Sequence, residues 1–162
     1  MAYLKNNGIQ NVVALTGDLH AIFAGQVMDD FDAAAPVPVM VDLMTPGVSS
    51  TSLLNFYIEA IKDANHAYDA MAGLVVQDVN NYTGDNLSAT ITNSGPWIKY
   101  ADTDAQGYAV VTLTPGNLVC QIKKVNKLSA DGAAAPSGSS LIAKIVTATV
   151  VAGTADVSVS AG

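Results

Sequence analysis

The sequence NVVALTGDLH, residues 11–20, joins an apolar run to a turn that carries an acid and a histidine. An apolar run closed by glycine is typical of a buried β-strand, and residues at the carboxyl end of such a strand commonly face a crevice. Gly17 permits a sharp turn. The i, i+2 spacing of Asp18 and His20 places a carboxylate oxygen and an imidazole nitrogen on one side of an extended turn, as two neighbouring metal ligands require. The turn therefore predicts two metal ligands. In the alternative interpretation, Asp18 caps the next element and His20 is a hydrogen-bonded turn residue.

Three further motifs follow this turn along the chain. Thr-Pro-Gly-Val-Ser-Ser lies at 45–50, Lys-Tyr-Ala-Asp at 99–102, and Gly-Tyr opens a strand-like run at 107–108. Over about residues 9–125, this order resembles the C-terminal part of the alkaline phosphatase D family of metallophosphoesterases. The resemblance implies an α+β fold, namely the C-terminal part of a metallophosphoesterase-like β-sandwich with flanking helices. A strand-rich C-terminal tail would follow it.

The resemblance also implies a function, the metal-dependent hydrolysis of phosphate monoesters or diesters. In such chemistry two cations polarise the phosphoryl oxygens and lower the pKa of a bound water, and the family suggests calcium and iron as the ions. Asp18 and His20 carry over as metal ligands. Family members are several times longer, and the other aspartate, tyrosine, asparagine and cysteine ligands are expected in an upstream portion that this sequence lacks. Because even catalytic zinc sites usually have three protein ligands, the truncated chain by itself is expected to be inactive.

Five other residues are candidates for a place near the substrate. They are Thr45, Ser49, Ser50, Asp102 and Tyr108. The serines follow a glycine without forming a Gly-x-Ser-x-Gly elbow, which argues against serine-hydrolase chemistry. Tyr108 either leans toward the substrate or packs as a hydrogen-bonded neighbour.

The segment 102–107 has a second interpretation as the opening of a calcium loop. Its oxygen side chains stand at positions one, three and five, with glycine at position six, as in an EF-hand. Leu113 occupies the position of the distal acid, inside a predicted strand. A true EF-hand is therefore not expected, and the family resemblance implies instead a polar loop that enters the Gly-Tyr strand near the active-site mouth.

Composition limits the other function classes. The 162 residues are 50% hydrophobic and 13% charged, and the formal net charge is −7. All seven basic residues are lysines, so binding to nucleic acid is not expected, because phosphate-backbone contact depends on clustered Lys and Arg. No stretch is long and apolar enough for a membrane span. The sequence opens without a signal peptide, yet its low charge and the family resemblance favour an extracellular or periplasmic protein.

The chain divides into three parts by composition. We assign residues 1–128 to the metallophosphoesterase-like C-terminal segment and 129–140, rich in Ala, Gly and Ser, to a flexible linker or loop. Residues 141–162 form a β-strand tail, which is either an extension of the sheet or a hairpin that binds a partner.

The pattern of apolar residues predicts the elements inside these parts. Two buried strands are expected within residues 9–48 and two helices within 49–82, with Ser50 or Ser52 as a helix cap. Pro-Gly-Asn at 115–117 joins two alternating runs and predicts a β-hairpin.

Five polar or reactive residues have simpler expected roles. Cys120 lies in an alternating strand and is expected in the core. Lys123, Lys124 and Lys127 are expected on a solvated face that protects a sheet edge. His66 is expected at a helix end or on the surface.

A hypothesis of a different class treats the chain as a non-catalytic, β-rich structural or self-associating module. A segment cut from a larger sheet exposes an unpaired edge and an apolar face, which a homodimer would cover. In a third hypothesis, a separate upstream chain complements this one and restores activity.

Overall fold

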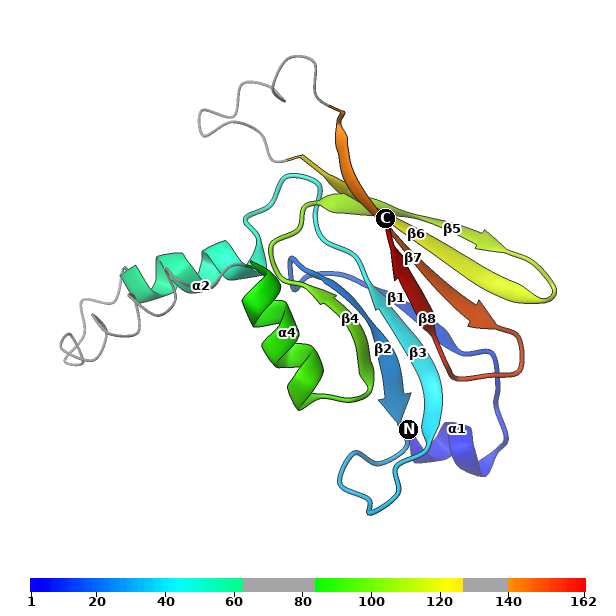
Figure 1. Cartoon of the computed structure of the whole chain (residues 1–162). Coiled ribbons are helices and arrows are strands. Elements are labelled where there is room, and N and C mark those ends of the chain that lie inside the picture. Colours follow the sequence, from blue (N-terminus) through cyan, green and yellow to red (C-terminus); the bar gives the residue numbers. More distant parts are fainter. Residues whose placement is uncertain (63–83, 127–139) are drawn as a thin grey trace.

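Two four-stranded sheets packed face to face form the framework (Figure 1). The computed structural model describes residues 1–62, 84–126 and 140–162. The first sheet has the order β1-β3-β2-β4 and the second the order β5-β6-β7-β8. The first contains β1 (Val13–Thr16), β2 (Ile22–Met28), β3 (Pro38–Met44) and β4 (Ile98–Asp102). The second contains β5 (Gly107–Leu113), β6 (Asn117–Val125), β7 (Ile142–Val151) and β8 (Ser158–Ala161).

The first sheet is mixed because β1 runs parallel to β3, whereas β2 is antiparallel to both β3 and β4. Along β3, Val39, Val41 and Leu43 are buried, and the residues between them are half-buried. This alternation shows that one face of β3 packs into the core while the other remains partly accessible. In the strand order, β1 lies at the edge of this sheet, and among the described strands it pairs only with β3.

The core lies between the sheets. Cys120 and Ile122 of β6 are fully buried there, which confirms the expectation for Cys120. Burial raises the pKa of the Cys120 thiol. The buried members of this cluster are Ile22, Ala24, Val41, Leu43, Ala105, Cys120, Ile122, Val146, Ala148, Val150 and Val157.

Three helices are described, α1 (Ala2–Asn6), α2 (Leu53–Lys62) and α4 (Gly84–Ser94). α4 lies beside β4 (Figure 1). The Ser52 hydroxyl accepts a hydrogen bond from the Asn55 amide at 3.3 Å, so Ser52 caps α2, one of the two predicted positions. None of the described helices has the length and apolar character needed to cross a bilayer.

The fold confirms the predicted α+β, strand-rich β-sandwich with few helices. The Pro-Gly-Asn hairpin is present, with Leu113 opposite Leu118. Residues 9–48 hold three strands rather than the expected two, because β2 begins directly after the Asp18–His20 turn. The tail extends the sheet, since β7 pairs with β6 and β8 with β7. The second predicted helix near residues 71–78, His66 and most of the 129–140 segment lie outside the described residues.

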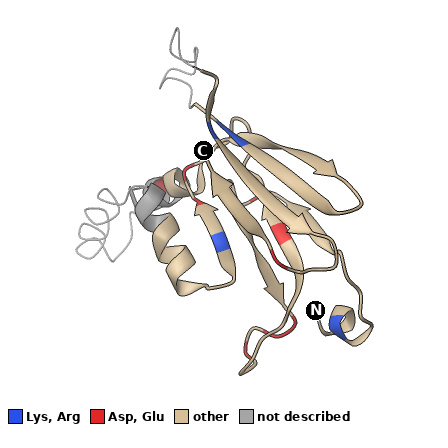
Figure 2. Cartoon of the chain, turned by 45° about the vertical axis from the view of Figure 1, so that its right-hand side comes forward, with Lys and Arg blue, Asp and Glu red and all other residues tan. Residues whose placement is uncertain are grey.

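Charged side chains are sparse over the strands, and acidic residues gather in the loop between β2 and β3 (Figure 2). Asp29 in this loop forms an ion pair with Lys5 of α1 and accepts a hydrogen bond from the Val37 amide at 2.8 Å. These two contacts, the lysine first, lower the pKa of Asp29 from 3.8 to about 2. The acidic loop is thereby tied to the N-terminal helix.

This ion pair predicts an acid-dependent loss of stability. Because the folded state favours ionised Asp29, its stabilising contribution is present above the ordinary pKa of 3.8 and is lost as the pH falls toward about 2. Lys5→Met is expected to make this loss shallower, measured as the free energy of unfolding by urea denaturation across that range. Lys99→Met is the control, because the Lys99 ammonium donates to the Pro96 carbonyl and not to a carboxylate. An equal change in both variants would contradict the assignment.

Candidate functional site

The predicted metal-binding turn begins where β1 ends. Thr16, the last residue of β1, accepts a hydrogen bond from the Thr45 amide at 3.0 Å through its carbonyl. The Thr16 hydroxyl donates to Asp42 of β3 at 2.6 Å. One backbone bond and one side-chain bond therefore hold the end of β1 against the segment that contains β3. They fix the position at which the Asp18–His20 turn begins.

The turn itself has an unusual backbone. Asp18 and His20 have φ values of 72° and 57°, in the left-handed region that non-glycine residues seldom adopt. The Leu19 amide donates to the Gly17 carbonyl at 2.9 Å, which closes a tight turn between them. Such backbone conformations cost of order 1–3 kcal/mol each and are concentrated at functional sites. The strain here falls on the two residues that the sequence singled out.

The ring of His20 is held in one tautomer. Its Nδ1 lies 2.7 Å from the Thr51 carbonyl oxygen. A carbonyl only accepts hydrogen bonds, so Nδ1 carries the proton and donates it, which leaves the lone pair on Nε2. Metal-binding histidines are commonly oriented by such a bond from the second ring nitrogen. His20 therefore offers Nε2 as a ligand atom.

Asp18 and His20 line the same pocket, together with three apolar residues. The pocket has a volume of about 440 Å³, and Leu19, Leu53 and Phe56 complete its lining. Asp18 is exposed and His20 half-buried. The structure thus brings the two predicted ligands to one surface, as their i, i+2 spacing suggested.

The first turn of α2 is fastened to this pocket. The Leu53 amide donates to the His20 carbonyl at 3.0 Å, and the Leu54 amide donates to the Thr103 carbonyl at the same distance. Ser52, the helix cap, donates from its hydroxyl to Asp104 at 2.6 Å. These bonds set the position of α2 relative to the His20 ring.

The three predicted residues of the Thr-Pro-Gly-Val-Ser-Ser segment lie beside the turn but do not line the pocket. Thr45 follows β3 and bonds Thr16, as described above, while Ser49 is exposed. The hydroxyl oxygen of Ser50 is enclosed and has no hydrogen-bond partner among the described residues. It lies next to Gly47, where a Cβ would collide with the Ser50 hydroxyl unless that side chain moved.

Asp102 and Tyr108 also lie outside the pocket. Asp102 is buried, receives a hydrogen bond from Lys124 at 2.7 Å and accepts another from the Asp104 amide at 3.1 Å. Tyr108 is exposed on β5, with the Lys123 ammonium 5.8 Å from its ring centroid. The expectation that Lys124 lies on a solvated face that protects a sheet edge is wrong, because it forms this ion pair with Asp102 and β6 is an inner strand of its sheet.

The side chains of the turn supply only some of the ligands that a metal ion needs. No group of three histidine, cysteine, aspartate or glutamate side chains within the described ranges is arranged to hold an ion. Asp18 and the Nε2 of His20 supply one carboxylate and one imidazole, a combination compatible with iron and with other divalent ions. Further ligands would have to come from outside the described residues.

Sequence reasoning missed the apolar part of the pocket. Leu19 and Phe56 are 44% and 62% exposed, although both are large and apolar. The clue that the sequence offered to this apolar wall was that Leu53 and Phe56 follow a predicted serine cap of a helix. The contact between α2 and the His20 turn depends on the tertiary fold, which no local pattern encodes.

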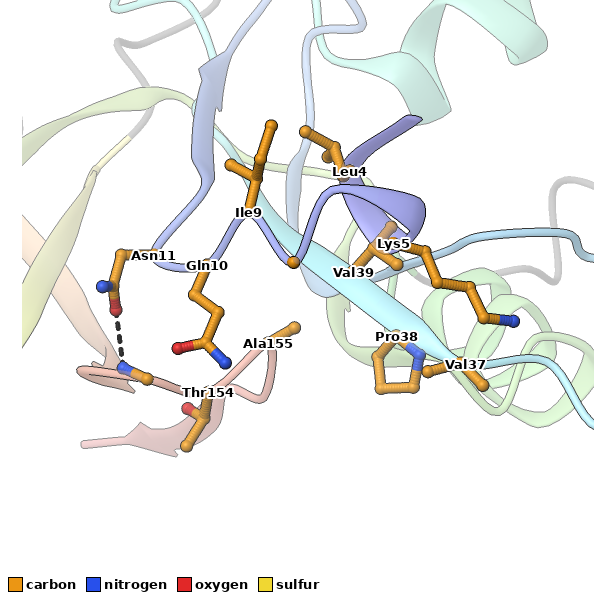
Figure 3. Close-up of a pocket in the computed structure, with 12 residues that line it drawn as sticks. Leu4, Lys5, Ile9, Gln10, Asn11, Val37, Pro38, Val39, Thr154 and Ala155 are labelled. Atoms are coloured by element: carbon orange, nitrogen blue, oxygen red, sulfur yellow. Dashed lines mark hydrogen bonds between the residues drawn. The ribbon is translucent and has the colours of Figure 1, made fainter. Parts of the chain in front are cut away.

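A second pocket holds none of the predicted site residues (Figure 3). It has a volume of about 200 Å³ and lies between α1, the start of β3 and the turn that joins β7 to β8. The Asn11 side chain accepts a hydrogen bond from the Gly153 amide at 2.6 Å and so ties the N-terminal segment to that turn. This contact supports the fold rather than a reaction.

The fold resembles that of a known protein. A solved structure described as "Structure of PhoD" resembles this chain with a TM-score of 0.57 and 16% sequence identity. The alignment covers 97% of this chain and 23% of the PhoD chain. No curated protein matches the sequence. At this identity the likeness establishes the fold alone.

The sequence itself matches a family of phosphatases. The match to the model of PhoD-like phosphatases extends over residues 1–122, about three quarters of the chain. The chain belongs to the PhoD-like phosphatase family. It spans about a quarter of the length of the PhoD chain with which it aligns.

Proposed function

We propose that this chain supplies Asp18 and His20 to the metal centre of an enzyme that hydrolyses phosphate esters. The observation that carries the proposal is the Nδ1 hydrogen bond from His20 to the Thr51 carbonyl, which reserves Nε2 for a ligand. Asp18 reaches the same pocket from a strained backbone conformation. Membership of the PhoD-like phosphatase family gives the reaction class.

Each residue of the turn has a defined part in this proposal. Asp18 would bind the ion through a carboxylate oxygen and neutralise part of its charge, and His20 would bind it through Nε2. The Thr51 carbonyl keeps His20 in the coordinating tautomer, and the bond from Leu53 to the His20 carbonyl keeps the ring in place. When bound, calcium and iron, the ions suggested by the family resemblance, would polarise a phosphoryl oxygen and acidify a bound water.

Two protein ligands leave the coordination of a catalytic metal incomplete. We propose that the rest of the site is supplied by polypeptide outside the described residues. Cys120 is not one of the missing ligands, because it is buried between the sheets and its thiol pKa is raised. The substrate would be a phosphate monoester or diester, and an extracellular or periplasmic site of action follows from the same resemblance.

The proposal predicts that metal binding depends on Asp18. In a protein with the complete metal centre, we expect Asp18→Ala to retain at least about tenfold less iron or calcium than the wild type, measured by elemental analysis after dialysis. Turnover of p-nitrophenyl phosphate and bis-p-nitrophenyl phosphate at alkaline pH should fall with the metal content. Asp32→Ala, which changes an exposed carboxylate of the β2–β3 loop, should behave as the wild type. Equal metal content in the wild type and Asp18→Ala would contradict the proposal.

A further inference from the structure

Residues 51–53 hold His20 from two directions. The Thr51 carbonyl accepts a hydrogen bond from Nδ1 of the His20 ring at 2.7 Å, and the Leu53 amide donates to the His20 carbonyl at 3.0 Å. The orientation of the ring and the left-handed backbone of His20 therefore both depend on this short segment. A strained backbone conformation persists only where the surrounding structure fixes it. The contacts that fix residues 51–53 thus also fix His20.

Ser52 is the buried member of this segment. It is 1% exposed, whereas Thr51 is exposed and Leu53 is half-buried. The Ser52 hydroxyl accepts a hydrogen bond from the Asn55 amide and donates one to Oδ1 of Asp104 at 2.6 Å. An amide N–H can only donate, so the hydroxyl proton is directed to the carboxylate, and such a short bond to a carboxylate is stronger than one between neutral groups. The bond to Asp104 therefore anchors Ser52 and the residues on either side of it.

Asp104 can act as an anchor because several bonds fix its own loop. Its amide donates to the Asp102 carboxylate at 3.1 Å. The preceding residue, Thr103, is fully buried, and its amide donates to the Ser88 hydroxyl of α4 at 3.1 Å. The Thr103 carbonyl accepts the bond from the Leu54 amide of α2. Because β4, α4 and α2 all meet at this loop, the loss of any one of these bonds should leave the Asp104 carboxylate in place.

Two further bonds join the same pair of chain segments. The Gly107 amide donates to the Gly47 carbonyl at 3.1 Å, and the Gln106 side-chain amide donates to the Ser50 carbonyl at 2.8 Å. Both connect neutral groups, and neither involves residues 51–53. They position the Thr-Pro-Gly-Val-Ser-Ser segment, whereas the serine–aspartate bond acts on the residues that hold the histidine.

We propose that Asp104 is a positioning residue of the metal centre. Its carboxylate holds the Ser52 hydroxyl and thereby places the Thr51 carbonyl where it binds the Nδ1 proton of His20, so that Nε2 is kept for the ion. Asp104 does not line the pocket that contains Asp18 and His20, and it would not touch the ion. The inference rests on the proposed function, because it gives Asp104 a part in metal binding by His20.

The tautomer of His20 tests this role without any metal. In the chain labelled with isotopic nitrogen at histidine, NMR at alkaline pH, where histidine rings are neutral, shows which ring nitrogen carries the proton. The chain has two histidines, so His66→Gln assigns the signals. We expect the wild type to carry the proton on Nδ1. Asp104→Ala should shift the ratio of the two tautomers toward a proton on Nε2 by roughly three- to tenfold, as for the loss of one ordinary hydrogen bond.

Three further variants separate this role from a general loosening of the fold. Ser52→Ala removes the other partner of the bond and should give the same shift, which keeps the test decisive if Asp104→Ala does not fold. The double variant should shift no further, because both substitutions act on one interaction. Asp104→Asn keeps an acceptor oxygen and should restore part of the wild-type ratio. Ser88→Ala is the matched control, because it breaks a bond of Thr103 in the same loop and should lower stability without changing the tautomer.

The outcomes distinguish this inference from the proposed function. A wild-type tautomer ratio in folded Asp104→Ala, or an equal shift in Ser88→Ala, would overturn the role of Asp104 and leave the metal proposal untouched. In a protein with the complete metal centre, Asp104→Ala should weaken the affinity for iron or calcium by about tenfold. Unchanged affinity in Asp104→Ala, with metal lost in His20→Ala, would also overturn that role. Metal retained in His20→Ala would instead contradict the proposed function itself.

Discussion

His20→Ala is expected to lower the affinity for iron or calcium by at least about 100-fold, since loss of a mere outer partner of a metal ligand already costs 10–100-fold. The expectation follows from the hydrogen bond between Nδ1 and Thr51, which leaves Nε2 as the ligand atom in the pocket that also contains Asp18. In a protein with a complete metal centre, turnover of bis-p-nitrophenyl phosphate should fall in parallel. Equilibrium dialysis with elemental analysis measures the affinity directly.

The control for this variant must distinguish the loss of a metal ligand from a change in the conformation of the turn. His20→Ala also removes the bond to Thr51, so circular dichroism and thermal unfolding should accompany the affinity measurement. Leu19→Ala changes the residue between the two proposed ligands, which lines the same pocket but has no metal-binding atom in its side chain. It should retain metal. A metal affinity that is unchanged in His20→Ala, or reduced equally in Leu19→Ala, would show that His20 is only a turn residue.

Local patterns in the sequence predicted much of the fold. The Pro-Gly-Asn turn and its alternating flanks predict the β5–β6 hairpin, because turn geometry and a two-residue period are both local. The strand β2 was missed because only Ala21 separates the Asp18–His20 turn from its start at Ile22, so no loop marks the boundary. The order of the strands depends on pairing between distant segments, such as β1 with β3, and no short pattern encodes it.

At the candidate site, too, local features could be predicted from the sequence and tertiary contacts could not. That Asp18 and His20 face one pocket was predictable, because both residues and their spacing occur within four residues of sequence. The apolar wall that Leu53 and Phe56 form was not, because it depends on where α2 begins in space. Lys124 was expected in solvent because its neighbours in sequence are basic. Its partner Asp102 is 22 residues away and is brought to it by the turn into β5.

Asp102→Ala is expected to lower the free energy of unfolding by about 2–3 kcal/mol, somewhat less than for a fully buried ion pair. The Asp102 side chain is 11% exposed and its partner Lys124 24% exposed. Removing the carboxylate leaves the Lys124 ammonium partly buried without its counter-charge. It also removes the acceptor of the Asp104 amide hydrogen bond. Urea denaturation followed by circular dichroism would measure the change.

A double-mutant cycle tests whether Asp102 acts through its ion pair with Lys124 or through a role near the substrate. If Asp102 acts mainly through Lys124, Lys124→Met in the Asp102→Ala background should recover part of the lost stability, because it removes the unpaired charge. Asp102→Asn keeps an acceptor for the Asp104 amide and should cost less than Asp102→Ala. The metal content of all these variants, measured below their unfolding transitions, should equal that of the wild type, because Asp102 does not line the pocket that contains Asp18 and His20. A variant that keeps its stability but loses metal would place Asp102 in the site after all, and the ion pair with Lys124 would then be incidental.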